Sequence, residues 1–563
     1  MKNTIVIFFL LLSIPAFSQK KDVGFLLAQE LFEAKKYYEA LYEFQSVKTY
    51  DQGEEDFKNK YIAKIYALLE NSKEATPYLS KLNSDDKDLL IGKNFLKTHQ
   101  TDSAIFYLEN AVNVQQINAE ASYFLGNAYF EKNDFEKAYQ NFSTAKSNGF
   151  VTDNLNKKIG VCAYFYGNFL EATVALEDAK TTLGSDIQLN NYLGMSYFNI
   201  ARKDLAIETL RNTIYKNPNE ISIAELAVNL SLIFDDLREN DSAVFYLKKA
   251  LEIDPNRVDA LYFLGNKFYD LKMYKQSQYY FEKLLNINPN YEKAYKQLAN
   301  AYYLDNVYDK AIEKYRQSTF FDKKPAEELN FIGVCYLQNN DLVKAKSYFE
   351  EALKVDATFF QAYMNLANLS FQENLFDDAI SYLSYANQYK KNNPDVNFLF
   401  AKVYLQTEKL ADAEYYFKET IRFDPLKKKA YLYLGYLALL KENFNEANFY
   451  YDILLTFEPL NFEGNLYRGI SSYLNKDNVA AITYLLKAKN IDPKDYQTRY
   501  QLAKAYLENK DYMESYILLN ALNIENPTDI RINYLLQKTC KALGIKDEAK
   551  QNKDVVKAFE KVK

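Results

Sequence analysis

Residues 261–303 read LYFLGNKFYD LKMYKQSQYY FEKLLNINPN YEKAYKQLAN AYY, and this stretch decides the fold. Gly265 and Ala299 lie 34 positions apart, and a small residue recurs at that interval through the units that follow. A period of this length is typical of a helix–turn–helix unit that buries its apolar face only by stacking on copies of itself. The stretch therefore predicts an all-α solenoid of repeated helix pairs.

Three kinds of residue recur at fixed distances in each unit. Twelve residues after the first small residue comes a second one, which is Ala or Ser in all 16 candidate units from Ala40 to Ala549. Four residues later a bulky apolar residue recurs, as at Phe281 and Tyr315. Small residues let two helix backbones approach closely while the bulky residue fills the gap beside them. The first small-residue position holds Ala28, Ala63, Gly92, Gly126, Gly160, Gly194, Ser231, Gly265, Ala299, Gly333, Ala367, Ala401, Gly435, Gly469 and Ala503, with Gln537 in the last unit.

Prolines separate the units, because proline cannot continue a helix but is tolerated at the start of the next one. Seven of them fall at one fixed distance after the first small residue: Pro218, Pro255, Pro289, Pro425, Pro459, Pro493 and Pro527. With small residues at repeat positions 8 and 20, an aromatic residue or Leu at 24 and Pro at 32, the chain resembles the tetratricopeptide repeat family from about Asp22 onward. The resemblance implies a right-handed α-solenoid superhelix of about 16 helix–turn–helix repeats.

The chain departs from the family at repeat position 4, where the family favours Trp or another large apolar residue. We expect looser packing on that face in the repeats that carry asparagine there, which are those with Asn156, Asn190, Asn397, Asn465 and Asn533.

Irregular spacings subdivide the array. The first small residues are 35 apart between Ala28 and Ala63, 29 apart between Ala63 and Gly92, and 37 apart between Gly194 and Ser231. These intervals predict irregular N-terminal repeats over 19–90, a set of repeats over 91–220 and a regular array over 221–545. The charged, amphipathic segment 546–563 is the polar capping helix that the end of a solenoid needs for solubility.

The segment 1–18 has the pattern of a secretory signal peptide. Lys2 supplies positive charge, residues 5–14 are mostly apolar, and Ala16-Phe17-Ser18 forms a small-x-small cleavage site. An apolar run of about ten residues is too short to span a bilayer. We therefore expect cleavage near Ser18–Gln19, export to the periplasm or the extracellular space, and no transmembrane span in the mature chain.

Composition argues against catalysis and against nucleic acid. A formal net charge of −6 and a pI near 5.4 do not suit a polyanionic ligand. The single histidine, His99, excludes paired-histidine metal motifs and is expected in a solvated turn. Cys162, Cys335 and Cys540 are interpreted as small buried hydrophobic residues rather than disulfide partners. No catalytic residue, metal or cofactor is predicted.

The resemblance places the binding surface on the concave face, which the family lines with the first helix of each repeat at positions 2, 5, 9, 12 and 13. Amides interleaved with aromatic rings suit an extended peptide, whose backbone needs donors and acceptors. The alternative is that the rings are half-buried packing residues and the amides only solvate the groove. The predicted partner-binding residues are Tyr262, Asn266, Tyr269, Asp270, Lys296, Asn300, Tyr303, Asn330, Met364, Asn368, Phe371, Gln372, Phe398 and Lys402.

Lys296 and Asn300 match the first half of a clamp by which some family members hold a C-terminal carboxylate. The other slots of that clamp hold Phe331, Gln361 and Asn365, so its basic residues are missing and the clamp is not expected. The sequence predicts a non-enzymatic exported scaffold that binds protein or peptide partners and organises an envelope or secretion complex. A carbohydrate-binding module that uses the same aromatic and amide residues is the alternative.

Overall fold

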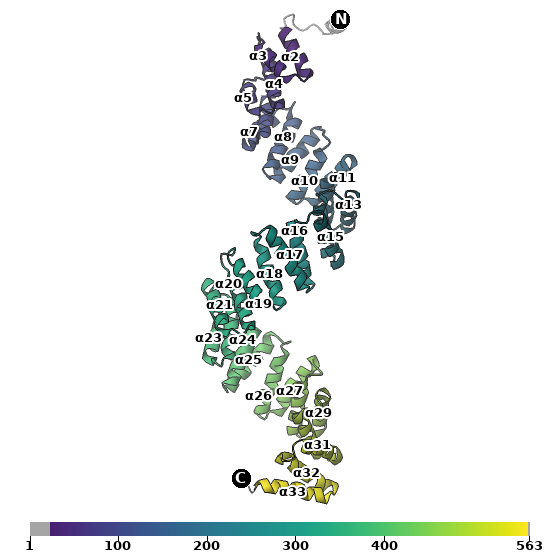
Figure 1. Ribbon diagram of the computed structural model, residues 1–563, viewed down its shortest axis with the longest axis vertical. Coiled ribbons are helices and arrows are strands. Elements are labelled where there is room, and N and C mark those ends of the chain that lie inside the picture. The colour runs from purple at the N-terminus through teal and green to yellow at the C-terminus, as the bar shows by residue number, and fades with distance from the viewer. Residues whose placement is uncertain (1–22, 561–563) are drawn as a thin grey trace. The chain divides into compact units, whose positions relative to one another are not determined.

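The computed structural model describes residues 23–560, with side chains through Lys557, as helices joined by short turns. The signal peptide predicted for residues 1–18 lies outside the described residues. Within them the chain forms 32 helices and no strands, which makes 16 consecutive helix pairs (Figure 1). The prediction of an all-α repeat solenoid is confirmed.

The helices fall into two compact units, and in both the even-numbered helix is the first of its repeat and the odd-numbered helix the second. The unit that ends at Asn290 contains α2 (Val23–Glu33), α3 (Tyr37–Ser46), α4 (Gln52–Leu68), α5 (Ser72–Ser80), α6 (Lys87–Lys97), α7 (Thr101–Val112), α8 (Asn118–Glu131), α9 (Phe135–Ser147), α10 (Leu155–Tyr166), α11 (Phe169–Leu183), α12 (Ile187–Asn199), α13 (Lys203–Lys216), α14 (Ile223–Asp236), α15 (Asn240–Ile253), α16 (Val258–Asp270) and α17 (Tyr274–Ile287).

The unit that begins at Tyr291 contains α18 (Glu292–Leu304), α19 (Tyr308–Ser318), α20 (Ala326–Gln338), α21 (Leu342–Val355), α22 (Phe360–Gln372), α23 (Phe376–Tyr389), α24 (Pro394–Gln406), α25 (Leu410–Phe423), α26 (Lys428–Leu440), α27 (Phe444–Phe457), α28 (Phe462–Leu474), α29 (Asn478–Ile491), α30 (Tyr496–Glu508), α31 (Tyr512–Glu525), α32 (Ile530–Leu543) and α33 (Lys546–Glu560).

The small residues allow the two helices of a pair to touch. Residues at the second small-residue position are buried throughout, from Ala40 at 0% exposure to Ala549 at 5%. At Gly333 an added Cβ would lie 2.6 Å from Cε1 of Phe349 and 3.1 Å from the carbonyl oxygen of Ala345. The eight glycines at the first small-residue position all abut the bulky residue 16 positions later in this way. Glycine recurs there because the facing ring or leucine occupies the space of a side chain.

The turn inside each repeat is built on one residue with left-handed backbone, seven positions after the first small residue. It is glycine at Gly167 and Gly544, but a residue with a side chain elsewhere, as at Asn133 (φ 59°) and His99 (φ 54°). In some repeats a side-chain cap follows, as where Asp134 Oδ1 accepts from the backbone N–H of Lys137 at 3.2 Å. His99 is exposed at this turn, as predicted.

Asparagine at repeat position 4 does not loosen the packing where its hydrogen bonds are seen. The expectation of looser packing is wrong for Asn465 and Asn533. Asn465 is fully buried, and its Nδ2 donates to the carbonyl of Pro459 at 3.0 Å. Asn533 bonds Pro527 in the same way at 2.9 Å. In a neighbouring repeat the hydroxyl of Tyr431 reaches the equivalent carbonyl. Asparagine is accommodated because its amide satisfies a carbonyl of the turn between repeats.

The irregular spacings have local causes. The short interval between Ala63 and Gly92 reflects α5, a short helix that contains Pro77. The long interval between Gly194 and Ser231 reflects the longer connection between α13 and α14, residues 217–222.

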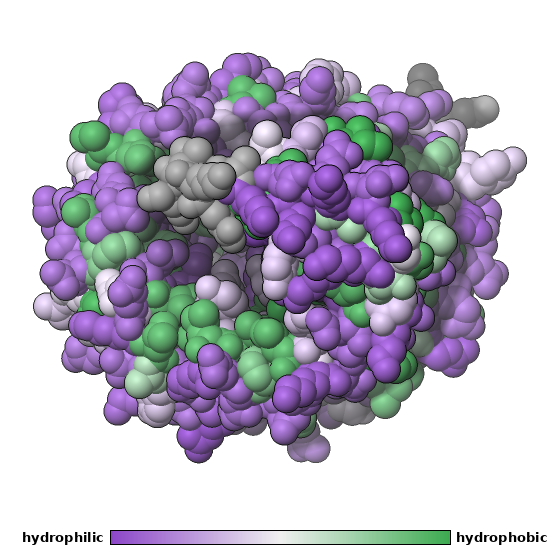
Figure 2. Space-filling view, turned by 90° about the horizontal axis from the view of Figure 1, so that it is seen from below, coloured by the Kyte–Doolittle hydropathy of each residue, from purple (hydrophilic) through white to green (hydrophobic). Residues whose placement is uncertain are grey.

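Polar residues cover most of the visible face in Figure 2, with apolar residues as patches between them. No helix in residues 23–560 is both long enough and apolar enough to cross a membrane. The three cysteines are buried and unpaired, as predicted, and burial raises the pKa of the Cys162 and Cys335 thiols to about 12.

Candidate functional site

The predicted residues on α16 are used mainly within their own repeat. The half-buried Tyr262 packs edge-on against Phe281, with ring centroids 6.0 Å apart. Asn266 donates from Nδ2 to the carbonyl of Tyr262 at 3.0 Å. Tyr269 packs against Tyr274, and burial raises the pKa of its phenol. Asp270, at the end of the same helix, is exposed.

Lys296 and Asn300 on α18 have partners inside the chain. The Lys296 ammonium lies 2.6 Å from Glu327 and 3.2 Å from Glu328 on α20. Partial burial opposes the charged form, but the two carboxylates outweigh it and raise the pKa of Lys296. Asn300 Oδ1 accepts from the hydroxyl of Tyr315 at 2.5 Å. The two residues that resembled half a carboxylate clamp are therefore engaged in internal contacts.

Tyr303 and Asn330 also make contacts within the second unit. The half-buried Tyr303 packs against Tyr308 with centroids 5.8 Å apart, and burial raises the pKa of its hydroxyl. Asn330 is 5% exposed and accepts from Nδ2 of Asn365 at 2.8 Å. These two residues connect neighbouring helices.

The structure brings together Phe371 and Lys402 from consecutive repeats. The Lys402 ammonium lies 4.4 Å from the centre of the Phe371 ring. Burial lowers the pKa of Lys402, and the charge of Lys429 adds to this effect. Asn368 is exposed and bonds the carbonyl of the half-buried Met364 at 2.8 Å.

Gln372 is exposed at the end of α22, whereas Phe398 packs edge-on against Phe417 at 5.6 Å and against Tyr433 at 5.9 Å. The rings of Tyr262, Tyr269, Tyr303 and Phe398 thus lie against other rings of the chain. The carbohydrate alternative gains no support from these positions.

A groove that the sequence interpretation missed lies in the first unit. It is formed by the first helices of four consecutive repeats, α6, α8, α10 and α12, and has a volume of about 690 Å³. We call it the α6–α12 groove. It is lined by Lys93, Leu96, Lys97, Phe124, Asn127, Phe130, Glu131, Asn154, Lys157, Lys158, Val161, Gln188 and Tyr192.

The groove uses many of the repeat positions considered for the central repeats, but with a different chemistry. Its lining contains four lysines and one glutamate, in a chain whose formal net charge is −6. The prediction selected repeats in which Asn or Gln side chains accompany aromatic residues. It therefore did not include the repeats in which lysines accompany aromatic residues. Lysines at first-helix positions of neighbouring repeats were the signal that could have found it.

Two of the lysines pair with carboxylates of the next repeat. Lys93 lies 2.7 Å from Glu120 and 4.5 Å from the centre of the Phe124 ring. Lys157 lies 2.6 Å from Asp186, and the pKa of that carboxyl is lowered because its hydrogen bond with Lys157 and its bonds to the α12 N-terminus outweigh its partial burial.

Lys158 differs from both, because its ammonium contacts only uncharged oxygens. It bonds Oδ1 of Asn127 and lies 3.1 Å from the hydroxyl of Tyr123. It also lies 4.7 Å from the centre of the Tyr123 ring and 5.4 Å from that of Phe142. Lys158 therefore carries a half-buried positive charge that no carboxylate in the described chain neutralises.

Aromatic rings continue along the groove. Phe130 is 37% exposed and packs edge-on against Phe135. Tyr192 lies at the other end and contacts Phe165 and Tyr164, and burial raises the pKa of its hydroxyl. The groove thus combines an aromatic surface with positive charge.

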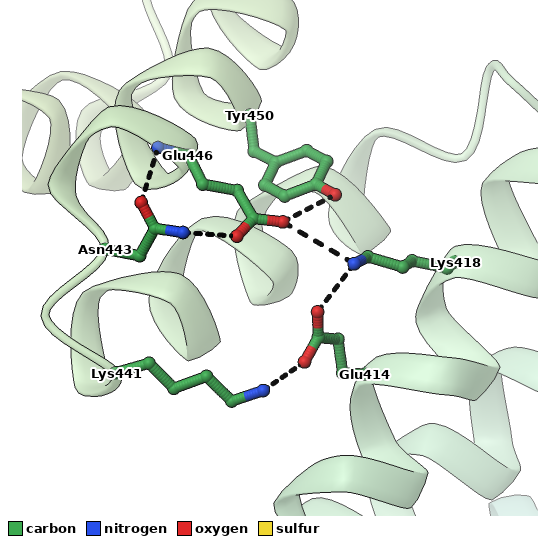
Figure 3. Close-up of polar contacts among 6 residues, drawn as sticks. All are labelled: Glu414, Lys418, Lys441, Asn443, Glu446 and Tyr450. Atoms are coloured by element: carbon green, nitrogen blue, oxygen red, sulfur yellow. Dashed lines mark hydrogen bonds and ion pairs between the residues drawn. The ribbon is translucent and has the colours of Figure 1, made fainter.

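The second unit has a polar network in which charges on consecutive repeats neutralise one another (Figure 3). Glu414 on α25 bonds Lys418 at 2.6 Å and also bonds Lys441, which follows α26. Lys418 reaches Glu446 on α27 at 3.5 Å, and Glu446 accepts from Asn443 at 2.8 Å. This network holds neighbouring repeats together, and both of its lysines have a counter-charge, unlike Lys158 in the α6–α12 groove.

The family models that match this chain all describe the same repeat. Models described as tetratricopeptide repeat match residues 89–148, 192–220, 224–257, 332–394 and 370–434. The chain is similar to BBSome complex member BBS4 of Bos taurus, at 24% identity over 288 residues that cover 51% of this chain and 54% of that protein. The mouse protein of the same name, from Mus musculus, is 27% identical over the same shares. The chain spans about half the length of these curated relatives.

Solved structures with similar helices were also found. The APC/C hetero-tetramer Cut9-Hcn1 has a TM-score of 0.34 and 14% identity, and the match covers 89% of this chain and 98% of that one. Yeast Tom70 has a TM-score of 0.33 and 16% identity, over 78% and 97%. The C-terminal part of a TPR repeat-containing protein from Cytophaga hutchinsonii has a TM-score of 0.36 and 18% identity, over 43% and 99%.

Proposed function

Because the chain belongs to the tetratricopeptide repeat family, we propose that it is a non-enzymatic exported scaffold that binds segments of partner proteins along its first helices. Members of this family are typically protein-interaction scaffolds. The observation that carries the proposal is the α6–α12 groove, an open channel across four repeats with rings and polar groups on its walls. Apolar pockets beside hydrogen-bonding groups are what an extended peptide needs.

The inventory of reactive groups supports a binding role. Residues 23–560 contain no group of three or more His, Cys, Asp or Glu side chains placed to hold a metal ion. The buried thiols have raised pKa values, so they are poor nucleophiles at neutral pH. We propose the concave-face residues of the central repeats as a second contact region, which includes the exposed Asn368 and Gln372.

The experiment is a crosslinking pull-down of the full-length protein from its own cells. Phe124→Ala/Tyr192→Ala changes the α6–α12 groove, and Asn368→Ala/Gln372→Ala changes the central region. We expect the groove variant to lose partners that the wild type captures, at unchanged helicity by circular dichroism. Recovery of the same partners by both variants would show that neither surface is the binding site.

We also propose export followed by a role in envelope or secretion complexes. Support comes from the Lys2 charge, the apolar residues 5–14 and the Ala16-Phe17-Ser18 site. N-terminal sequencing of the protein isolated from its cells is expected to begin at Gln19. A mature chain that starts at Met1 would contradict export by this route.

A further inference from the structure

The α6–α12 groove has a half-buried positive charge on Lys158, with which no carboxylate of the described residues forms an ion pair. Lys93 and Lys157 each have a carboxylate within 2.7 Å. The Lys158 ammonium is instead held by Asn127 and by the Tyr123 hydroxyl at 3.1 Å, two oxygens that bear no formal charge. An anion beside this half-buried ammonium would form a charge-assisted hydrogen bond that the chain itself does not supply, so this position suits an anionic ligand.

The rest of the groove indicates what carries the anion. Phe124 lines the same groove as Lys158, and the Lys93 ammonium lies 4.5 Å from the centre of its ring. Phe130, Val161 and Tyr192 continue the apolar surface on three helices. A free inorganic anion would leave these side chains uncovered. A ligand with both apolar groups and carboxylates would use the whole groove.

The dimensions of the groove suit an extended chain. First helices of consecutive repeats touch here, as α6 does α8 and α10 does α12. Since packed helices lie about 8–10 Å apart, four of them span about 24–30 Å. An extended polypeptide advances about 3.3 Å per residue, so about seven to nine residues would fill the groove.

We infer that the α6–α12 groove binds an extended acidic segment of a partner protein. A side-chain carboxylate of the segment pairs with Lys158, and neighbouring apolar side chains pack on Phe124, Phe130 and Tyr192. This inference rests on the proposed function and specifies the class of partner. A nucleic acid is also anionic, but it would extend beyond the groove along the surface of the protein. The chain's formal net charge of −6 would repel a polyanion of that length.

The test measures fluorescence anisotropy with the full-length protein and a labelled peptide, LLDDLLDDL, whose termini are both blocked. The same peptide with Asn in place of Asp is the uncharged control. Lys158→Gln removes the proposed contact, and Lys158→Arg keeps the charge. Lys146→Gln is the matched control, because it makes the same substitution on α9, a second helix outside the groove. The Lys146 side chain is 48% exposed.

We expect LLDDLLDDL to bind more tightly than LLNNLLNNL, and binding to weaken as salt is raised. Lys158→Gln is expected to weaken binding of the acidic peptide about tenfold, since charge-assisted hydrogen bonds are the strong ones. Lys158→Arg and Lys146→Gln are expected to bind as the wild type does. Thermal unfolding followed by circular dichroism separates lost binding from lost folding.

Equal binding of the two peptides, an absence of binding to the wild type, or an unchanged affinity in Lys158→Gln would overturn the inference. The proposed function fails separately, when Phe124→Ala/Tyr192→Ala and Asn368→Ala/Gln372→Ala both capture the same partners as the wild type. If Phe124→Ala/Tyr192→Ala loses partners but the wild type binds LLDDLLDDL and LLNNLLNNL equally, the scaffold function stands. The inference that the bound segment is acidic is then wrong.

Discussion

At the scale of single residues, the contact between a glycine and a bulky side chain sets the distance between the two helices of a repeat. Gly435 faces Tyr451, and Gly126 faces Phe142, in each case closer than a Cβ allows. Glycine inside a helix costs about 0.5–1 kcal/mol relative to alanine. Its use at these positions therefore reflects tertiary packing rather than helix propensity.

Gly333→Ala tests this explanation. The new methyl group would meet both Phe349 and the backbone oxygen of Ala345, so we expect a loss of about 1–3 kcal/mol in the free energy of unfolding. Urea denaturation followed by circular dichroism measures it. Ser347→Ala, at an exposed position on α21, is the control and should change stability by less than about 0.5 kcal/mol. A Gly333→Ala protein as stable as the wild type would contradict the close contact.

At the scale of elements, ion pairs between consecutive repeats support the apolar contacts. Glu414 connects α25 to Lys441 at the end of α26, and Lys418 extends the connection to α27 (Figure 3). Partial burial works against ionisation of Glu414, but hydrogen bonds from Lys418 and Lys441 outweigh it and lower the pKa of its carboxyl below 4.5. The ionised form is therefore favoured in the folded protein.

Glu414→Gln is expected to lower the thermal midpoint at pH 7. A carboxyl whose pKa is lower in the folded state contributes stability above its unfolded pKa and loses it as pH falls through the folded pKa. The difference in midpoint between wild type and variant should therefore shrink below about pH 4.5. Differential scanning calorimetry at pH 7 and at pH 3 measures both differences. Glu252→Gln, at an exposed position on α15, is the control, and an equal pH effect there would rule out the network as the cause.

At the scale of the whole molecule, stability is arranged along the chain. Within each unit the principal helix contacts join helices that are neighbours in sequence or first helices of consecutive repeats. In such an array the free energy of folding approximates a sum over repeats and the interfaces between them. A local defect should therefore loosen nearby repeats more than distant ones.

Ala311→Leu creates such a defect, because Ala311 is fully buried on α19 and a leucine there overpacks the pair formed with α18. Hydrogen exchange followed by mass spectrometry should show faster exchange in α18–α21, with little change in α28–α33. Glu313→Leu, at an exposed position on the same helix, should leave exchange unchanged. Uniformly faster exchange over α18–α33 would indicate one cooperative unit instead of a linear array.

Much of the fold could be predicted from local patterns. Each repeat needs a small residue where two backbones meet, a bulky one beside it and a break between helices, and these requirements recur at fixed spacings. They predicted the helix pairs, the buried cysteines and the position of His99. The turn geometry was less visible, because Asn133, Glu408 and His99 all adopt the same left-handed backbone with different side chains.

The periodic sequence by itself determined the architecture of this protein, since the small residues, the bulky residues and the breaks act within one repeat or between adjacent repeats. Only the tertiary structure decided which face is open and which lysines of the groove pair with a carboxylate. Lys157 meets Asp186, and Lys93 meets Glu120, across 29 and 27 positions of sequence, whereas Lys158 meets no carboxylate in the described chain. Whether a lysine of the groove meets a carboxylate depends on contacts between repeats, and the repeat pattern does not specify those contacts.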